Sequence, residues 1–373
     1  MSTRVLHVIS SLERAGAQRQ LALLCGALPA RGVLRRVIAL GAGPVSEDLR
    51  RLHVPVEQLH QRSILDLPTA RRLRATIQSA KPDLVHAWDP LSLMAVAGST
   101  IGDGAAAPVV ATLHRPPTGG RGVSGGGWPM RQLLRLAAKR TEVLVVNTAA
   151  VQTFYERLGI PSEAFRVIRC GVSAAPLGGS RNQLRAELGL PPETRLVALV
   201  GRLEPDRHVK DAIWATDLLK VIRGDVHLLV VGRGSHMPRL RRFRAQVRVA
   251  DRVHFLGVRG DASRIAAGCD VVWSTSAVEG QSYAILEAMA AGVPVVAADQ
   301  ASTRELIEHE RNGFLVSVGD RAGFARWTNA CLNDPDLALR VGEAGRRVVQ
   351  ERFSLDEFAD RYVAAYGAAL PRG

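Results

Sequence analysis

The sequence has no long apolar run. No stretch approaches the roughly 20 consecutive apolar residues that a membrane-spanning helix needs. The apolar run at residues 5–9 is too short for the core of a signal peptide. We therefore expect a soluble, cytoplasmic protein, and a peripheral place at the inner face of the membrane stays open.

Cysteine is scarce as well. The four cysteines lie far apart and form no Cys-x-x-Cys pair, namely Cys25, Cys170, Cys269 and Cys331. This spacing argues against a zinc knuckle or a dithiol redox motif. Isolated cysteines in apolar runs are typical of a reducing compartment, and no Walker A or His-Glu-x-x-His motif is present.

Lysine is nearly absent. Only Lys81, Lys139, Lys210 and Lys220 occur, so arginine supplies almost all of the 49 basic residues, which exceed the 35 acidic residues and give a net charge of +14. A guanidinium binds phosphate and carboxylate through a planar fork, and the surplus attracts anions. A GC-rich genome favours arginine too, and we attribute most of the surplus to it.

The 373 residues suffice for two domains, and one pattern occurs twice. The apolar run 4–9 precedes a helical pattern at 18–28, as the run 195–200 precedes one at 209–220. Further runs lie at 37–40, 83–86, 109–113 and 142–146, and at 226–231, 270–273, 293–297 and 313–316. Continuous apolar runs between helices are typical of strands buried on both faces of a parallel sheet. The predicted fold class is α/β, with two Rossmann-like doubly wound domains.

The boundary between the two copies is expected at the small, proline- and glycine-rich stretch 174–180. We assign domains to residues 1–173 and 174–350, followed by a C-terminal helix in 351–373 that can cross back to the first domain. In such folds ligands bind beyond the carboxyl ends of the strands, here in a cleft between the two sheets.

The most informative residues follow the predicted strand 270–273. Glu279 and Gly280 lie in a loop, and a helix is predicted over 281–291, whose first N–H groups can hold phosphate. Glu287 lies among apolar residues, so it needs a polar partner if buried, and a ribose diol is one such partner. The simpler alternative is that both glutamates are solvated acids.

This segment resembles the Glu-x7-Glu signature of the retaining GT-B glycosyltransferases of family 4 (glycosyl transferases group 1), Glu-Gly-Phe-Gly-x3-Leu-Glu-Ala-Met-Ala-x-Gly-x-Pro-Val-Val-Ala. The matching residues are Glu279, Gly280, Leu286, Glu287, Ala288, Met289, Ala290, Gly292 and 294–297. Gln281 and Ser282 stand where Phe and Gly are usual.

The resemblance implies roles for this segment. Glu279 would contact the donor sugar near its transferred carbon, and Glu287 would bind the nucleotide ribose. The intervening backbone would hold the diphosphate, which adds Gly280, Gln281, Ser282, Ile285 and Leu286 to the predicted donor-binding residues.

A second motif, residues 200–207, is similar to the family's Gly-Arg-Leu-x-Pro-x-Lys, whose two cations neutralise the donor diphosphate. Arg202 matches the Arg, and Arg207 occupies the Lys position. A cation is kept there and can stabilise the departing phosphate oxygens. Lys210 is a rival for this role, and a solvated loop arginine is the alternative for Arg207.

Four other positions complete the prediction. Gly16 matches part of the family's N-terminal Gly-Gly-Ala-Glu loop. Gly232 belongs to a turn that lines the nucleotide in the family, and Val258 ends a segment whose backbone reads the base. His114 follows the predicted strand 109–113, where the family places a histidine at the sugar or phosphate. His86 has an equivalent place, and a structural role is as plausible for both histidines.

Three tempting features receive other interpretations. Asp334-Pro335-Asp336 reads as a turn between helices rather than a metal motif. The arginines of 239–252 fill one face of an amphipathic helix rather than a nucleic-acid patch. The glycine-rich loop Gly119–Trp128, before the basic helix 130–140, is either an acceptor lid or membrane contact, or a plain connection.

We therefore expect a retaining hexosyltransferase of polysaccharide biosynthesis, independent of metal and cofactor. It would move a sugar from a UDP- or GDP-sugar to a hydroxyl of a glycan or lipid-linked precursor. The predicted catalytic residues are Glu279, His114, Arg202 and Arg207. Peripheral contact with an anionic membrane is an option, and nucleic acid is not an expected partner. The alternatives are a non-catalytic GT-B module that binds a nucleotide sugar or a partner, and a nucleotide-sugar epimerase.

Overall fold

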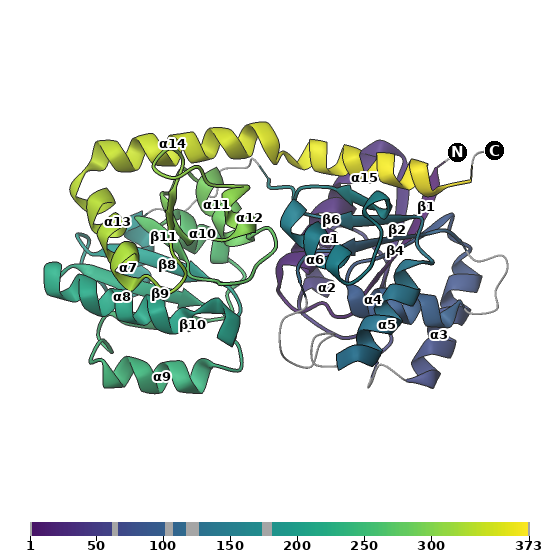
Figure 1. The fold of residues 1–373 in the computed structure, drawn as a ribbon, viewed down its shortest axis with the longest axis horizontal. Coiled ribbons are helices and arrows are strands. Elements are labelled where there is room, and N and C mark those ends of the chain that lie inside the picture. The colour runs from purple at the N-terminus through teal and green to yellow at the C-terminus, as the bar shows by residue number, and fades with distance from the viewer. Residues whose placement is uncertain (1, 62–65, 101–106, 117–126, 174–180, 372–373) are drawn as a thin grey trace. The chain divides into compact units, whose positions relative to one another are not determined.

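The computed structural model describes residues 2–61, 66–100, 107–116, 127–173 and 181–371 (Figure 1). The chain divides into two units. Unit 1 contains Met1–Gly171 together with Leu355–Gly373, and unit 2 contains Val172–Ser354. The predicted hinge 174–180 lies outside the described residues.

Unit 1 is built on a parallel sheet with the strand order β3-β2-β1-β4-β5-β6-β7. Its strands are β1 (Thr3–Ile9), β2 (Val33–Ala39), β3 (Val56–Gln58), β4 (Leu84–Ala87), β5 (Val109–Leu113), β6 (Val143–Val146) and β7 (Phe165–Val167). Its helices are α1 (Gly16–Ala27), α2 (Val45–Arg51), α3 (Leu67–Ala80), α4 (Pro90–Ser99), α5 (Gly127–Ala138), α6 (Ala149–Arg157) and α15 (Leu355–Ala369), with 3-10 turns at Pro29–Arg31 and Ser162–Ala164.

Helices cover both faces of this sheet. Along β1, Val5 and Ile9 join one apolar cluster, which also contains side chains of α1, α2 and α15. Leu6 and Val8 point the other way, into a cluster with side chains of α3, α4, α5 and α6. Successive strand residues face opposite sides, so the two clusters establish a doubly wound sheet and explain why β1 has apolar residues on both faces, at positions 5, 6, 8 and 9.

Two charged side chains explain why β2 is longer than the predicted run 37–40. Arg35 donates to backbone carbonyls, and Arg36 forms an ion pair with Glu57 of β3 at 2.8 Å. The arginines interrupt the apolar pattern without ending the strand, which starts at Val33. The short strands β3 and β7 have three residues each and were not predicted.

Unit 2 repeats the plan with the strand order β10-β9-β8-β11-β12-β13, again with parallel pairs. Its strands are β8 (Arg195–Val200), β9 (Val226–Val231), β10 (Val253–Gly257), β11 (Val271–Ser274), β12 (Val295–Ala298) and β13 (Phe314–Val316). The chain order reverses between β8 and β11. The prediction of two Rossmann-like parallel-sheet domains is confirmed.

The helices of unit 2 are α7 (Arg181–Glu187), α8 (Val209–Ile222), α9 (Met237–Gln246), α10 (Ala262–Ala267), α11 (Tyr283–Ala290), α12 (Ala301–Arg304), α13 (Arg321–Asn333) and α14 (Pro335–Arg352), with a 3-10 turn at Pro205–Arg207. Asp334 caps α14 by accepting a hydrogen bond from the Leu337 amide at 2.9 Å, as the turn interpretation requires. Helix α9 buries Leu240 and Phe243, which confirms its amphipathic character, but it ends at Gln246, so Arg248 and Arg252 lie beyond it.

Helix α15 packs on the sheet of unit 1 (Figure 1). His86 lies inside β4 and is fully buried, and its two ring nitrogens form hydrogen bonds with Tyr366 Oη and Thr112 Oγ1, each at 2.8 Å. Tyr362 Oη completes the cluster at 3.0 Å from Thr112 Oγ1. His86 is therefore a core residue that binds α15, and the strand-end role considered for it is wrong.

Two findings bear on the environment of the chain. Among the described helices, none combines the length and the apolar character needed to cross a membrane. All four cysteines are buried free thiols.

Candidate functional site

The predicted donor residues gather at the carboxyl ends of β8 and β11. These two strands are neighbours in the sheet, and they flank the point where the strand order reverses. Ligands of doubly wound folds bind at this point. A small pocket lies here, lined by Leu199, Val200, Gly201, Arg202, Arg207, Trp273, Ser274, Thr275 and Ser276.

The loop after β8 depends on close backbone contact. Gly232 has φ of +138°, and a Cβ there would lie 1.8 Å from the carbonyl oxygen of Gly201. A glycine at position 232 is therefore needed for the loops after β8 and β9 to lie this close together. This requirement does not depend on a contact between Gly232 and a nucleotide. His208 closes the 3-10 turn at φ of +50°, a left-handed conformation that is uncommon outside glycine.

Arg207 and Glu279 form a buried ion pair. Arg207 Nη1 donates to Glu279 Oε1 and, at 3.0 Å, to Ser276 Oγ. The two side chains are 14% and 10% exposed. The Arg207 carbonyl also accepts from Thr275 Oγ1 at 2.7 Å, so the turn after β8 is fixed to the strand end of β11.

Two opposing effects act on the pKa of Arg207. Burial disfavours the charged guanidinium, and the carboxylate of Glu279 favours it. The carboxylate prevails, so the pKa of Arg207 is raised above its ordinary value. The guanidinium is a permanent cation at this strand end.

Several polar atoms of this cluster lack a hydrogen-bond partner among the described residues. Glu279 Oε2 and Arg207 Nε are buried and have no hydrogen-bond partner among the described residues, and the same holds for Gln300 Nε2. Buried polar atoms without partners are costly. A polar ligand at this strand end would supply the missing partners.

Helix α11 presents the rest of the signature. It begins at Tyr283 with Ser282 as its N-cap, two residues later than predicted. Gly280, Gln281 and Ser282 are buried before it, and the helix leaves first-turn N–H groups without intrahelical partners. Among the backbone amides predicted to hold the diphosphate, that of Leu286 already forms an intrahelical hydrogen bond. Leu286 N donates to Ser282 O at 3.1 Å.

The remaining residues of α11 point inward. Ile285 and Leu286 are fully buried, and Glu287 is 5% exposed. The solvated-acid alternative for Glu287 is therefore wrong. A carboxylate this deep in an apolar helix requires polar partners.

Two predicted residues lie apart from this pocket. Lys210, on α8, is exposed, and its Nζ lies over the Phe243 ring of α9 at 4.4 Å from the centroid. Val258 follows β10 and is 46% exposed. The structure thus brings Arg202, Arg207 and Glu279 to the ends of β8 and β11 and directs Lys210 to another helix.

Unit 1 contains Gly16 and His114. Gly16 is the first residue of α1. His114 directly follows β5, and its ring stacks on Trp88 with centroids 5.6 Å apart. Neither ring nitrogen has a hydrogen-bond partner in the described ranges. Burial lowers the pKa of His114 to about 4, so its imidazole is neutral near pH 7.

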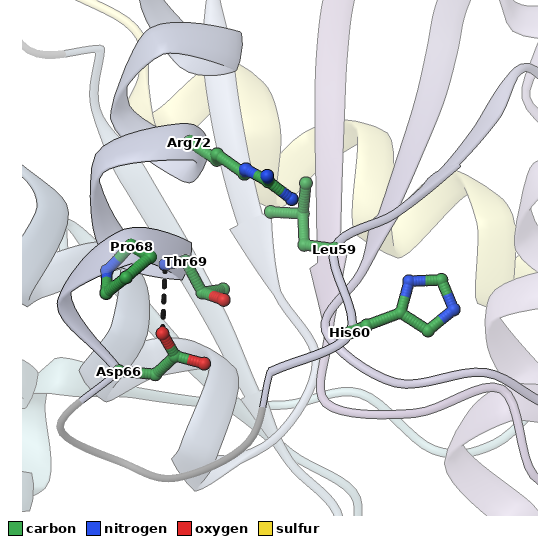
Figure 2. Close-up of a pocket in the computed structure, with 6 residues that line it drawn as sticks. All are labelled: Leu59, His60, Asp66, Pro68, Thr69 and Arg72. Carbon is green, nitrogen blue, oxygen red and sulfur yellow. Dashed lines mark hydrogen bonds between the residues drawn. The ribbon is translucent and has the colours of Figure 1, made fainter.

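A second pocket, of about 340 Å³, lies in unit 1 beside the first turn of α3. Figure 2 shows its lining residues, Leu59, His60, Asp66, Pro68, Thr69 and Arg72. Asp66 is engaged as the N-cap of α3 and accepts from the Thr69 amide at 3.2 Å. None of these six residues belongs to the predicted site, and the strand ends of unit 2 are the better candidate because their buried polar atoms lack partners.

Sequence reasoning missed three residues of the unit 2 site. Ser276 follows β11, and Gln300 and Ser302 follow β12; all three form hydrogen bonds with Arg207 or Glu279. The signal that identified Glu279, a polar residue just beyond a buried strand, also marks Gln300. Within the described ranges, no group of three or more His, Cys, Asp or Glu side chains could hold a metal ion. Residues 119–126 of the predicted lid lie outside those ranges.

The sequence matches two protein families. Residues 180–348 match "Glycosyl transferases group 1", and residues 14–175 match "Glycosyltransferase Family 4". Together the matches span both units.

Individual proteins are similar over most of the chain. The N-acetyl-alpha-D-glucosaminyl L-malate synthase of Bacillus anthracis is 25% identical over 81% of this chain and 78% of its own. A GDP-mannose-dependent phosphatidylinositol monomannoside mannosyltransferase of Mycobacterium tuberculosis is 28% identical over 77% and 76%. The crystal structure of Anabaena Alr3699/HepE in complex with UDP-glucose superimposes with a TM-score of 0.85 at 25% identity, covering 98% of this chain and 99% of that one.

Proposed function

Because the chain belongs to the group 1, GT4-type glycosyltransferases of the GT-B fold, we propose that it transfers a hexose from a nucleotide-diphosphate sugar to a hydroxyl, with retention of configuration. The observation that carries this proposal is the buried Arg207–Glu279 pair with its unpartnered polar atoms. It lies at the strand ends where the fold binds ligands.

Each donor group has a partner in unit 2. The diphosphate binds to Arg202, Arg207 and the first N–H groups of α11, which together neutralise it. The sugar lies against Glu279, and the ribose diol binds to Glu287. Bound UDP-glucose in the Anabaena structure and the GDP-mannose dependence of the mycobacterial relative support a UDP- or GDP-sugar as the donor.

The reaction keeps the sugar configuration when both bond changes occur on one face. The bond from the sugar carbon to the phosphate oxygen breaks, and a bond from that carbon to the acceptor oxygen forms on the same side. The acceptor proton moves to a donor phosphate oxygen. Arg202 and Arg207 stabilise the negative charge that develops on the departing diphosphate. His114, whose imidazole is neutral near pH 7, acts in the reaction as a hydrogen-bond partner rather than as an acid.

No metal or cofactor takes part in the proposed reaction, because the two arginines replace a divalent cation at the diphosphate. Activity should survive EDTA. Loss of activity with EDTA and recovery with Mn²⁺ would show that the diphosphate site is misassigned.

The acceptor is a glycan or a lipid-linked precursor, reached at the inner face of the membrane. Helix α5 supports this placement, because Leu133 and Leu136 are 44% and 60% exposed. Arg131 in the same helix and Lys139 and Arg140 just after it are exposed as well. Exposed leucines with cations suit an anionic membrane surface. Sedimentation with phosphatidylglycerol vesicles, but not with phosphatidylcholine vesicles, is the expected result.

Thermal unfolding with UDP, GDP, ADP and their sugars tests the donor assignment. A ligand at 100 times its dissociation constant adds about 2.7 kcal/mol of apparent stability. A donor that stabilises the protein should then be transferred or hydrolysed. Stabilisation without either reaction would favour a non-catalytic module, and inversion of a sugar centre would favour an epimerase.

A further inference from the structure

The peptide of Glu279 is held by two side chains from the start of α12. Gln300 Oε1 accepts a hydrogen bond from the Glu279 amide at 3.2 Å. Ser302 Oγ donates to the Glu279 carbonyl at 2.8 Å. The polar atoms on both sides of the Glu279 α-carbon are therefore bound to the segment that follows β12.

These contacts determine how the Gln300 carboxamide points. Its oxygen must face the Glu279 N–H, because an amide nitrogen cannot accept that hydrogen bond. Ser302 Oγ lies 3.3 Å from the same oxygen. The nitrogen, Nε2, consequently points away from both, is buried, and has no hydrogen-bond partner in the part of the chain that is described.

Gln300 Nε2 and Glu279 Oε2 have complementary needs. The first is a donor without an acceptor, and the second is an acceptor without a donor. A hydroxyl group can accept one hydrogen bond and donate another, so a sugar hydroxyl that lies between the two atoms would satisfy both. A phosphate could not, because it would face the Glu279 carboxylate with like charge.

We propose that Gln300 binds the sugar of the nucleotide-sugar donor, with Nε2 donating to a sugar hydroxyl that in turn donates to Glu279. This proposal rests on the proposed function. It assigns sugar recognition to a residue outside the Glu-x7-Glu signature. Gln300 then has two tasks, because the same side chain also holds the Glu279 peptide.

Calorimetry with two pairs of ligands tests the assignment, UDP against UDP-glucose and GDP against GDP-mannose. The informative quantity is the ratio of the two dissociation constants within a pair. Gln300→Met removes the N–H donor and should weaken nucleotide-sugar binding about 5- to 30-fold, the size of one lost polar contact. Binding of the free diphosphate should change less than about twofold.

Ser302→Ala is the matched control. It removes the other side-chain contact with the Glu279 peptide and leaves Gln300 Nε2 in place, so the ratio should stay as in the wild type. If Ser302→Ala shifts the ratio as much as Gln300→Met does, the effect comes from loop position and the direct contact is overturned.

The remaining outcomes are also decisive. An unchanged ratio in Gln300→Met means that water or another group occupies this place. Should Gln300→Met melt at a lower temperature, calorimetry is carried out well below that temperature, where the sugar-specific loss must persist. A wild-type protein that binds neither UDP nor GDP would instead overturn the proposed function itself.

Discussion

Strands β8 and β11 have a buried arginine–carboxylate pair at each end, and the two pairs differ in one respect. At the amino ends, Arg185 Nη2 lies 2.7 Å from Asp270 Oδ2, and both side chains are at most 5% exposed. At the carboxyl ends, Arg207 pairs with Glu279, with exposures of 14% and 10%. The charge types are therefore alike, and both pairs are largely shielded from solvent.

At the amino ends, both side chains of the pair use their hydrogen-bonding atoms in further contacts, and we call this pair saturated. Arg185 also donates to the carbonyls of Thr194 and Arg181, at 2.6 and 2.8 Å. Asp270 also accepts from the Leu196 amide at 2.8 Å and from Arg195. The pair at the carboxyl ends keeps one donor atom and one acceptor atom unused within the described ranges. Saturation indicates a structural role, and unused hydrogen-bonding capacity indicates a ligand.

The largest expected effect is on stability, at the saturated pair. Asp270→Asn leaves the Arg185 guanidinium buried without its counter-charge. Breaking such a pair should lower the free energy of unfolding by about 3–5 kcal/mol, measured by urea denaturation, while turnover per folded molecule stays unchanged. Asp83→Asn, which breaks an exposed pair with Arg4, should cost less than about 1 kcal/mol. Lost turnover with intact stability in Asp270→Asn would contradict the comparison.

At the unsaturated pair, the main expected effect is on turnover. Arg207→Ala removes a cation from the developing diphosphate charge and should lower turnover about 100-fold or more. Arg207→Lys keeps the charge and should retain most activity. Lys210→Ala should cost much less, because that ammonium lies over Phe243. If Lys210→Ala were the more damaging variant, the diphosphate cation would be Lys210.

Protonation extends the comparison to unit 1. His7 is fully buried, and burial lowers its pKa from 6.5 to about 3. Below pH 6.5 the unfolded chain binds a proton there that the folded chain does not, so stability falls as the pH drops from 6.5 towards 3. The loss is about 1.4 kcal/mol per pH unit for one such group.

His7→Leu should reduce this slope between pH 6 and 5, as measured by urea denaturation at each pH. The substitution will also lower the free energy of unfolding at every pH, because it removes the hydrogen bond that Trp88 Nε1 donates to His7 Nδ1 at 3.1 Å. The informative quantity is therefore the slope of this free energy against pH. A slope equal to that of the wild type would mean that His7 is protonated in the folded protein.

The smallest expected effect concerns Glu287. Glu287→Gln should weaken binding of the free nucleoside diphosphate several-fold, as one charged hydrogen-bond acceptor for the ribose is lost. Calorimetry measures it, with Glu351→Gln as a control on the exposed face of α14. Equal affinity of the two variants for the nucleoside diphosphate would mean that Glu287 does not bind the ribose.

The sequence was sufficient to predict the sheets, because buried parallel strands read as continuous apolar runs. It did not predict β3 and β7, because these short strands carry polar side chains and are only partly buried, whereas the equally short β13 is apolar. It also could not place His86, because a histidine in an apolar run has the same appearance in a strand centre and at a strand end. The partners of His86 come from α15, some 280 residues away in the chain.

For the site, spacing located Arg202, Arg207 and Glu279 at neighbouring strand ends. Spacing could not distinguish Arg207 from Lys210, which are three residues apart. In the structure the two residues differ in position. The left-handed turn at His208 separates the 3-10 turn of Arg207 from α8, and Lys210 lies over the Phe243 ring. Gln300 was missed because its proposed role follows from a hydrogen bond with the Glu279 amide, which lies 21 residues earlier in the chain.

The attachment of α15 to unit 1 has a consequence for folding of the protein during translation. Unit 2 is a continuous segment, Val172–Ser354, and can fold as soon as it has emerged. Unit 1 begins first, but its sheet keeps an uncovered apolar face, with His86 and Thr112 on it, until the last helix is translated. Of the two units, the one that begins earlier is thus completed later, and a premature stop codon shortly before Leu355 would spare unit 2 and leave unit 1 without α15.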